Sequence, residues 1–193
     1  MNICVYGASS KTIDAQFTDA GHALGNLIAQ HGYGLVFGGG DNGMMGAVAC
    51  GAHDGGGRVT GIAPRFFNVD GILYPHCDEL IYTDTMRERK QKMEDLSGAF
   101  IVTPGGIGTF EEFFEMLTLK QLGRHRKPMA LLNTLSYYEP LTALLERAVA
   151  DGFLARRCFQ LFGLCQTPRE ALDHVLTEQA PTGGLDRLED YAR

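Results

Sequence analysis

The fold of this protein is decided by residues 99–112, which read Ala99-Phe-Ile-Val-Thr-Pro-Gly-Gly-Ile-Gly-Thr-Phe-Glu-Glu112. The four apolar residues at its start predict a buried strand, and a helical pattern begins just after the glycines. The glycines therefore lie where a strand passes into a helix. A helix N-terminus offers N–H groups without acceptors and a partial positive charge, and glycines let an anion approach closely. Residues 103–109 are therefore predicted to bind phosphate.

A basic cluster precedes the same strand. It reads Met86-Arg-Glu-Arg-Lys-Gln-Lys-Met93 and is predicted to be helical, so its cations and the phosphate loop can face one pocket. The whole chain is acidic, with 17 Lys and Arg against 23 Asp and Glu and a net charge of −6. Such a balance argues against a nucleic-acid polymer or an anionic membrane as partner, so the basic residues act locally.

Short apolar runs alternate with amphipathic helical stretches along the chain. This alternation predicts an α/β fold, a Rossmann-like, doubly wound, mostly parallel sheet with helices on both faces. The expected strands are residues 3–6, 35–37, 59–63, 80–82, 99–102, 129–132 and 161–164. A length of 193 residues suggests one domain. We place it at residues 1–180 and expect residues 181–193 to form a loose tail.

The cysteines and histidines suggest neither disulfides nor a metal. Five cysteines are scattered without a C-x-x-C pair or a secretory leader, which indicates reduced thiols in the cytoplasm. No apolar stretch approaches the ~18 residues that span a bilayer. His76-Cys77-Asp78 is too compact for a zinc set, so no metal site is expected.

A second glycine loop raises the question of a dinucleotide. Gly38, Gly40 and Gly43 match G-x-G-x-x-G between a strand and a helix. The acidic residue that holds the ribose about 20 positions later is missing, because the next strand ends in Ile62-Ala-Pro64. The loop is better explained as a backbone surface for a smaller phosphorylated ligand or a neighbouring loop. Close helix packing is the alternative.

Two motifs together resemble a known family. Pro104, Gly105, Gly106, Gly108, Thr109 and Glu112 match P-G-G-x-G-T-x-x-E, and Met86, Arg89 and Lys90 match M-x-x-R-K. These are hallmarks of the LOG (Lonely Guy) family of cytokinin riboside 5′-monophosphate phosphoribohydrolases, often labelled lysine decarboxylases. The likeness extends over about residues 3–181 and includes the loops at residues 7–10 and 38–46.

The resemblance implies a homodimeric, cofactor-free hydrolase that cleaves nucleoside 5′-monophosphates to free base and ribose 5-phosphate. It implies that Arg89 and Glu112 are catalytic. The expected substrate-binding residues are Lys90, Gly105, Gly106, Ile107, Gly108, Thr109, Phe110, Glu111, Thr118, Ser9, Gly39, Gly40 and Met86. Arg87 and Ile107 stand where plant-like members have His and Tyr. The preference between prenylated adenine and plain AMP is therefore open.

Other interpretations compete with this one. An acid at Glu112 is favoured by the helix dipole alone, and Arg89 and Lys90 can be exposed charges that pair with Glu94 or Asp95. A decarboxylase with pyridoxal phosphate needs a Schiff-base lysine, and no lysine here has that context. The main alternative function is a nucleotide or molybdenum-cofactor carrier of the same fold, which has no need of a carboxylate at the sugar.

Overall fold

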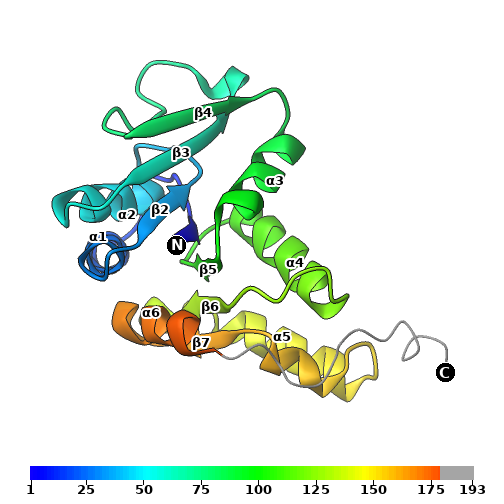
Figure 1. Ribbon diagram of the computed structural model, residues 1–193. Helices are drawn as coiled ribbons and strands as arrows, with labels where there is room; N and C mark the ends of the chain where they lie inside the picture. The colour runs from blue at the N-terminus through cyan, green and yellow to red at the C-terminus, as the bar shows by residue number, and fades with distance from the viewer. Residues whose placement is uncertain (179–193) are drawn as a thin grey trace.

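The computed structural model describes residues 1–178 and has a single parallel sheet at its centre (Figure 1). Its strand order is β4-β3-β2-β1-β5-β6-β7, and every neighbouring pair is parallel. The strands are β1 (Asn2–Tyr6), β2 (Gly34–Phe37), β3 (Val59–Pro64), β4 (Glu79–Thr83), β5 (Ala99–Val102), β6 (Met129–Leu132) and β7 (Gly163–Cys165). The predicted doubly wound α/β fold is confirmed.

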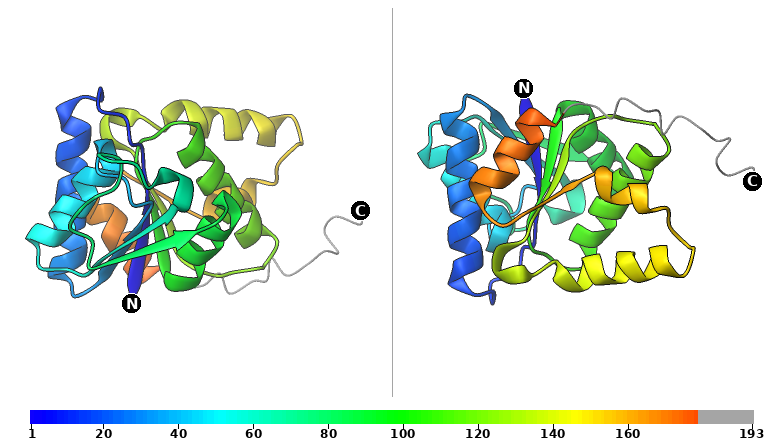
Figure 2. Two further views of the ribbon diagram at one scale, coloured as in Figure 1. Left: turned by 90° about the horizontal axis from the view of Figure 1, so that it is seen from above. Right: turned by 90° about the horizontal axis from the view of Figure 1, so that it is seen from below.

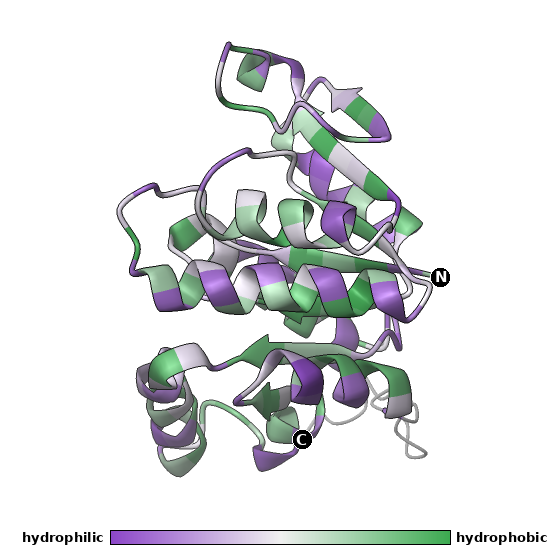
Figure 3. Ribbon diagram, turned by 90° about the vertical axis from the view of Figure 1, so that its left-hand side faces the viewer, coloured by the Kyte–Doolittle hydropathy of each residue, from purple (hydrophilic) through white to green (hydrophobic). Residues whose placement is uncertain are grey.

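Helices cover both faces of the sheet. They are α1 (Ala15–Gln30), α2 (Gly43–Asp54), α3 (Met86–Leu96), α4 (Ile107–Gln121), α5 (Glu139–Ala150) and α6 (Pro168–Thr177). Figure 2 shows α1, α2 and α6 on one side of the sheet and α3, α4 and α5 on the other. The strands are mostly hydrophobic and the helices are banded with both colours in Figure 3. This is the pattern of a buried sheet covered by amphipathic helices.

The sheet divides the core into two layers. Leu24, Val48 and Leu172 belong to the layer under α1, α2 and α6. Met93 and Phe113 belong to the layer under α3, α4 and α5. Every residue of β3, β5 and β6 is buried, because a parallel sheet with two covered faces exposes neither side to water.

Local signals for strands and helices are confirmed with small shifts. The last strand begins later than its predicted run at residues 161–164: a short 3-10 helix, Arg156–Gln160, comes just before that run, and β7 is Gly163–Cys165. A capping box begins the last helix, α6. The Thr167 hydroxyl accepts from the Glu170 N–H at 3.2 Å, and the Glu170 carboxylate accepts from the Gln166 N–H at 2.8 Å.

The strand order predicts where a ligand-binding cleft lies in this fold. The chain adds β2, β3 and β4 on one side of β1 and then returns to add β5 on the other. At such a reversal, the loops leaving two neighbouring strands diverge and open a cleft at their carboxyl ends. Here those loops follow β1 and β5, and the second of them is the predicted phosphate loop.

Two sequence expectations are not settled by the fold. The proposed tail at residues 181–193 lies outside the described residues, and a domain limit at residue 180 stays a prediction. No helix within residues 1–178 is long and apolar enough to cross a membrane.

Candidate active site

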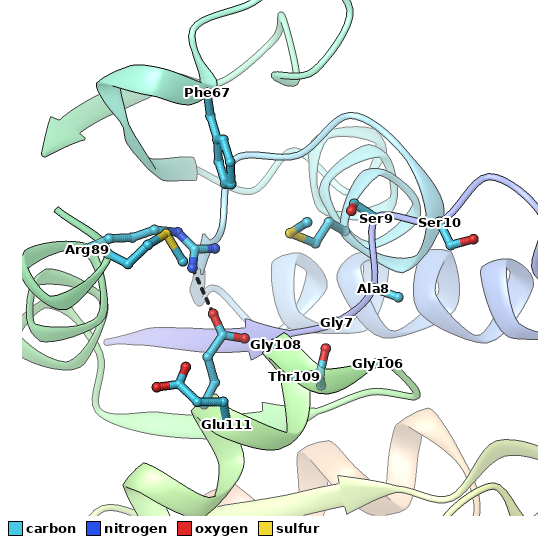
Figure 4. Close-up of a pocket in the computed structure, with 13 residues that line it drawn as sticks. Gly7, Ala8, Ser9, Ser10, Phe67, Arg89, Gly106, Gly108, Thr109 and Glu111 are labelled. Atoms are coloured by element: carbon cyan, nitrogen blue, oxygen red, sulfur yellow. Dashed lines mark hydrogen bonds and ion pairs between the residues drawn. The ribbon is translucent and has the colours of Figure 1, made fainter. Parts of the chain in front are cut away.

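A cavity of about 370 Å³ opens at the carboxyl ends of β1 and β5 (Figure 4). Its walls come from the loop after β1, the starts of α2, α3 and α4, and the turn after β3. The lining residues are Gly7, Ala8, Ser9, Ser10, Met45, Phe67, Met86, Arg89, Gly106, Gly108, Thr109, Glu111 and Glu112. The cleft predicted from the strand order is therefore hollow, and both polar and apolar residues line it.

Arg89 and Glu112 form a buried ion pair in this cavity. Nη1 of Arg89 donates to Oε1 of Glu112 at 2.9 Å, and Nε of Arg89 donates to the Ile62 carbonyl at 3.0 Å. The side chains are only 6% and 9% exposed. They come from α3 and α4, so the pair joins two helices over one end of the sheet. The alternative of an exposed Arg89 that pairs with Glu94 or Asp95 is excluded.

Burial changes the acidity of Glu112. Removal from water disfavours the carboxylate and raises its pKa above the ordinary value, while the charge and hydrogen bond of Arg89 oppose this shift. A carboxylate that is held charged away from water by one guanidinium interacts strongly with any cationic centre that forms beside it. The pair is therefore suited to stabilise positive charge in a substrate.

Gly38 provides the space for the guanidinium. A Cβ atom at residue 38 would lie 2.0 Å from Nη2 of Arg89, which is an impossible contact. The second glycine loop thus contributes to the site in an indirect way. Its Gly38 leaves the space into which the Arg89 side chain packs. The missing side chain of this first glycine lets an arginine side chain, and not a dinucleotide, come close to the backbone.

The phosphate loop presents an open surface. Gly106 precedes the first residue of α4 and uses no side-chain cap. A Cβ at Gly106 or Gly108 would meet nothing within 4 Å, so both glycines face free space. The N–H groups of the first helical turn lack acceptors within the helix and point out of its end. The loop is therefore available to an anion in the same cavity as the ion pair.

Two consecutive tyrosines hold this loop from behind. The Tyr138 hydroxyl donates to the Thr103 carbonyl and the Tyr137 hydroxyl to the Gly105 carbonyl, each at 2.6 Å. Just before them, Leu135 and Ser136 have φ values of 54° and 58°, in the left-handed region that such residues avoid. The two hydrogen bonds that this turn makes possible offset the free energy that its backbone strain costs.

Eight of the predicted site residues line the cavity. They are Ser9, Met86, Arg89, Gly106, Gly108, Thr109, Glu111 and Glu112. Gly105 lines a smaller neighbouring hollow, and Ile107 is 82% exposed beside the opening. Phe110 lies at the edge of the core, where its ring meets that of Tyr138 at 6.5 Å.

The structure places the other predicted residues elsewhere. Gly39 and Gly40 are buried, and Gly40 forms a β-bridge with Leu73. Thr118 is exposed farther along α4. Lys90 lies in another groove, where its ammonium pairs with Glu111 and Glu115. Burial there favours the neutral amine, but these two hydrogen bonds prevail and leave the pKa of Lys90 raised.

Sequence reasoning missed several lining residues. Gly7, Ala8 and Ser10 follow β1, and their loop was noted only as resembling a family feature. The rule that neighbouring parallel strands end at one edge would have found them. Phe67 points into the cavity from the turn after β3 (Figure 4). It stands in an irregular segment, and no periodicity marks its direction.

Several known proteins are similar to this chain in sequence. The family described as "Possible lysine decarboxylase" matches residues 45–175. The cytokinin riboside 5′-monophosphate phosphoribohydrolase LOG of Oryza sativa subsp. japonica is 39% identical over 168 residues, 87% of this chain and 69% of that protein. An Arabidopsis thaliana enzyme of the same description is 38% identical over 179 residues, 93% of this chain and 83% of that protein. The chain belongs to the LOG family.

A solved structure shows how widely the LOG fold is shared. The Moco carrier protein of Chlamydomonas reinhardtii superposes with a TM-score of 0.68 at 25% identity, over 90% of this chain and 94% of that one. At this level of identity the likeness concerns the fold. What distinguishes members of such a fold is the site, and here the site contains the Arg89–Glu112 pair.

The decarboxylase description does not fit the cavity. A lysine that forms a Schiff base needs a free amine in the pocket. Among the described residues that line the cavity there is no lysine, and the nearby Lys90 is held by two glutamates. The ionic groups that line this cavity of a LOG-family member include the paired carboxylate of Glu112 and guanidinium of Arg89.

The tyrosine contacts lead to a stability prediction. Tyr138→Phe leaves the buried Thr103 carbonyl without its donor, which should lower the free energy of unfolding by ~1–3 kcal/mol. Urea denaturation measures this. Tyr82→Phe is the matched control, because its hydroxyl bonds to Asn68 at the exposed surface and its loss should change stability by less than ~0.5 kcal/mol. Equal losses in the two variants would contradict a supporting role for Tyr138.

Proposed function

We propose that this protein hydrolyses the N-glycosidic bond of cytokinin riboside 5′-monophosphate. Water adds to C1′ of the ribose, the bond from C1′ to the base nitrogen breaks, and free base and ribose 5-phosphate leave. The observation that carries the proposal is one cavity that contains both an anion-binding helix end and a buried carboxylate–guanidinium pair. The names of relatives at 38–39% identity support the same reaction.

The phosphate of the substrate is assigned to the start of α4. N–H groups of residues 106–109 and the Thr109 hydroxyl provide donors, and the helix end adds its partial positive charge. Ser9 and Ser10 face the same space from the loop after β1. Binding a remote phosphate in this way holds the ribose at a fixed distance from the catalytic pair, which lowers the entropic cost of reaction.

Glu112 is assigned to the reacting centre. Cleavage builds positive charge on the ribose in an oxocarbenium-like transition state and negative charge on the leaving base. The carboxylate of Glu112 stabilises that positive charge or orients the attacking water. Arg89 keeps Glu112 ionised and in place, and its remaining N–H groups can bind ribose or phosphate. No step in this scheme uses a metal or a redox cofactor.

The wall opposite the phosphate loop is assigned to the base. Met45, Phe67 and Met86 contribute apolar surface to the cavity. An adenine ring fits such a surface, and methionine side chains adjust to substituents of different sizes. We therefore propose that plain AMP is also a substrate. The ratio of the hydrolysis rates of cytokinin riboside 5′-monophosphate and AMP measures which of the two the enzyme prefers.

A homodimer in the cytoplasm completes the proposal. Ile107 is 82% exposed and Phe153 is 86% exposed, and large apolar side chains at the surface often mark contact regions. As the family resemblance implies, we expect the cavity to lie near the subunit interface of this dimer. In that arrangement Lys90 and Thr118, which lie outside the cavity of their own chain, face the partner. The free cysteines suit a reducing compartment.

The alternative is a carrier of the same fold. The likeness to the Chlamydomonas reinhardtii carrier, at 25% identity, is evidence for a shared fold and not for a shared function. A carrier needs the phosphate loop but gains nothing from a buried carboxylate, which costs desolvation energy. The Arg89–Glu112 pair therefore favours the enzyme.

Glu112→Gln tests the catalytic assignment. Glutamine keeps the shape and can still accept from Arg89, but it lacks the negative charge, so kcat should fall by at least ~10²-fold. Chromatography of free base and ribose 5-phosphate, with AMP and isopentenyladenosine monophosphate as substrates, measures the rates. Glu115→Gln is the control one turn farther along α4, outside the cavity, and should keep kcat.

The possible results separate the two functions. Base release by the wild type and by Glu115→Gln, but not by Glu112→Gln, supports the hydrolase. Absence of release from the wild type together with tight nucleotide binding, measured by calorimetry, supports the carrier instead.

The acid limb of the pH profile tests the raised pKa of Glu112. The reaction needs the carboxylate, and burial raises the pKa of Glu112, so kcat should begin to fall at a higher pH than an ordinary glutamate of pKa ~4.3 would allow. The negative charge of the bound phosphate raises the pKa of Glu112 further. The measurement is kcat at saturating substrate from pH 8 downward. An unchanged kcat down to ~4.3 would contradict an ionised Glu112 in the transition state.

Gly38→Ala tests the placement of Arg89. The added Cβ overlaps Nη2, so the guanidinium must move, and a shift of ~1 Å near the reacting groups can cost ~10² in kcat. Gly98→Ala is the control, since the one close contact of its Cβ would be the flexible Met1 side chain at 2.7 Å, and the Asn2 carbonyl oxygen would lie at an ordinary 3.9 Å. Thermal melts of both variants check the fold. If Gly38→Ala retains full kcat, the position of Arg89 is not critical.

A further inference from the structure

A second cluster of reactive side chains lies on the other side of the sheet. His22 extends from α1, and Cys50 and Asp54 extend from α2, one turn apart. Both helices cover the face opposite α3 and α4, which carry the catalytic pair. Within residues 1–178 this is the one set of three such groups whose donor atoms converge. The catalytic scheme uses none of them.

The separations between donor atoms suit a small metal ion. Nε2 of His22 lies 2.9 Å from Oδ2 of Asp54, Sγ of Cys50 lies 3.7 Å from the same oxygen, and all three atoms lie within 4.8 Å of one another. Zinc bonds of about 2.0–2.3 Å arranged tetrahedrally require ligand-to-ligand separations of about 3.3–3.8 Å. Small rotations of these side chains are enough to reach that geometry.

The helices beneath the cluster are held rigidly. A Cβ at Gly51 would lie 2.0 Å from the His22 carbonyl oxygen, so the two backbones touch at the position of the cluster. The contact fixes the distances between the backbone positions that carry the three side chains. A binding site whose ligands come from a rigid frame loses little entropy when it closes.

We propose that His22, Cys50 and Asp54 bind a transition-metal ion of the Zn²⁺ class, with water as the fourth ligand. Imidazole, thiolate and carboxylate are the three side chains that zinc prefers, and three protein ligands with one water form an open tetrahedral site. On binding, the thiol gives its proton to solvent and the sulfur bonds to the metal. The ion ties α1 to α2 and stabilises the fold.

The protonation of the cluster is compatible with this role. The hydrogen bond from His22 lowers the pKa of Asp54, so its carboxylate is charged at neutral pH. A thiol must lose its proton to become a metal ligand, so binding at Cys50 releases a proton. A surface hydrogen bond between His22 and Asp54 alone contributes little to stability. Cys50, one turn before Asp54 on α2, places its sulfur 3.7 Å from the same oxygen, so three atoms of metal-binding types converge at one point.

Titration with Co²⁺, a spectroscopic substitute for Zn²⁺, tests the proposal on the full chain with any affinity tag removed. One equivalent should produce the near-ultraviolet charge-transfer absorption of a cobalt–thiolate bond, and Zn²⁺ should abolish it by displacement. Cys50→Ser should lose the absorption. Cys77→Ser is the thiol control outside the cluster and should keep it.

Two further readouts guard against a misfolded variant. Zn²⁺ at 100 times its dissociation constant should raise the Tm of the wild type by about 5–10 °C and leave that of Cys50→Ser unchanged. His22→Gln should weaken Zn²⁺ binding by more than ~10²-fold, since even the outer partners of metal ligands contribute 10–100-fold. Without metal, all variants should melt like the wild type.

The outcome is independent of the proposed hydrolysis. Cys50→Ser should cleave nucleotide at the rate of the wild type, because the cluster lies across the sheet from Glu112. Absence of cobalt–thiolate absorption in the wild type, or an unchanged spectrum in Cys50→Ser, would overturn the proposal and leave the hydrolase assignment as it stands.

Discussion

The ion pair between Arg89 and Glu112 is the constraint around which this molecule is arranged. Two opposite charges almost without exposure to water are tolerated only where good geometry and further hydrogen bonds compensate their desolvation. Here the Ile62 carbonyl supplies the additional acceptor, and Gly38 leaves the volume for the guanidinium. Four segments of the chain must therefore be in place at once, and the helices α3 and α4 are fixed relative to β3 and β2.

The phosphate loop obeys a different constraint. To bind an anion, the loop needs backbone N–H groups that remain unsatisfied within the protein and open to the cavity, and such groups destabilise the loop by themselves. The compensation comes from the opposite side, where Tyr137 and Tyr138 anchor two of its carbonyls through a turn with strained φ angles. The loop is thus rigid on one side and free on the other. A preorganised site of this kind loses little entropy when an anion binds.

Sequence reasoning was most reliable where a signal is local. The strand before the glycines and the helix after them each depend on residues within a few positions of one another, and the structure confirms both. It was weaker for residues far from any motif. Lys90 adjoins Arg89 in the chain, but neighbouring residues of a helix point about 100° apart, so only one of them enters the cavity. Phe67 and Gly38 act through contacts whose partners are distant in sequence.

The amino-acid sequence alone determined the α/β class, the succession of strands and the motifs of the family, because hydrophobic periodicity and glycine placement are properties of short segments. The tertiary structure decided which of those residues meet. Only the strand order brings the loop after β1 against the loop after β5, and only the close packing of α1 on α2 gathers His22 with Cys50 and Asp54. Contacts between distant segments depend on how whole layers pack, and no local pattern encodes that distance or direction.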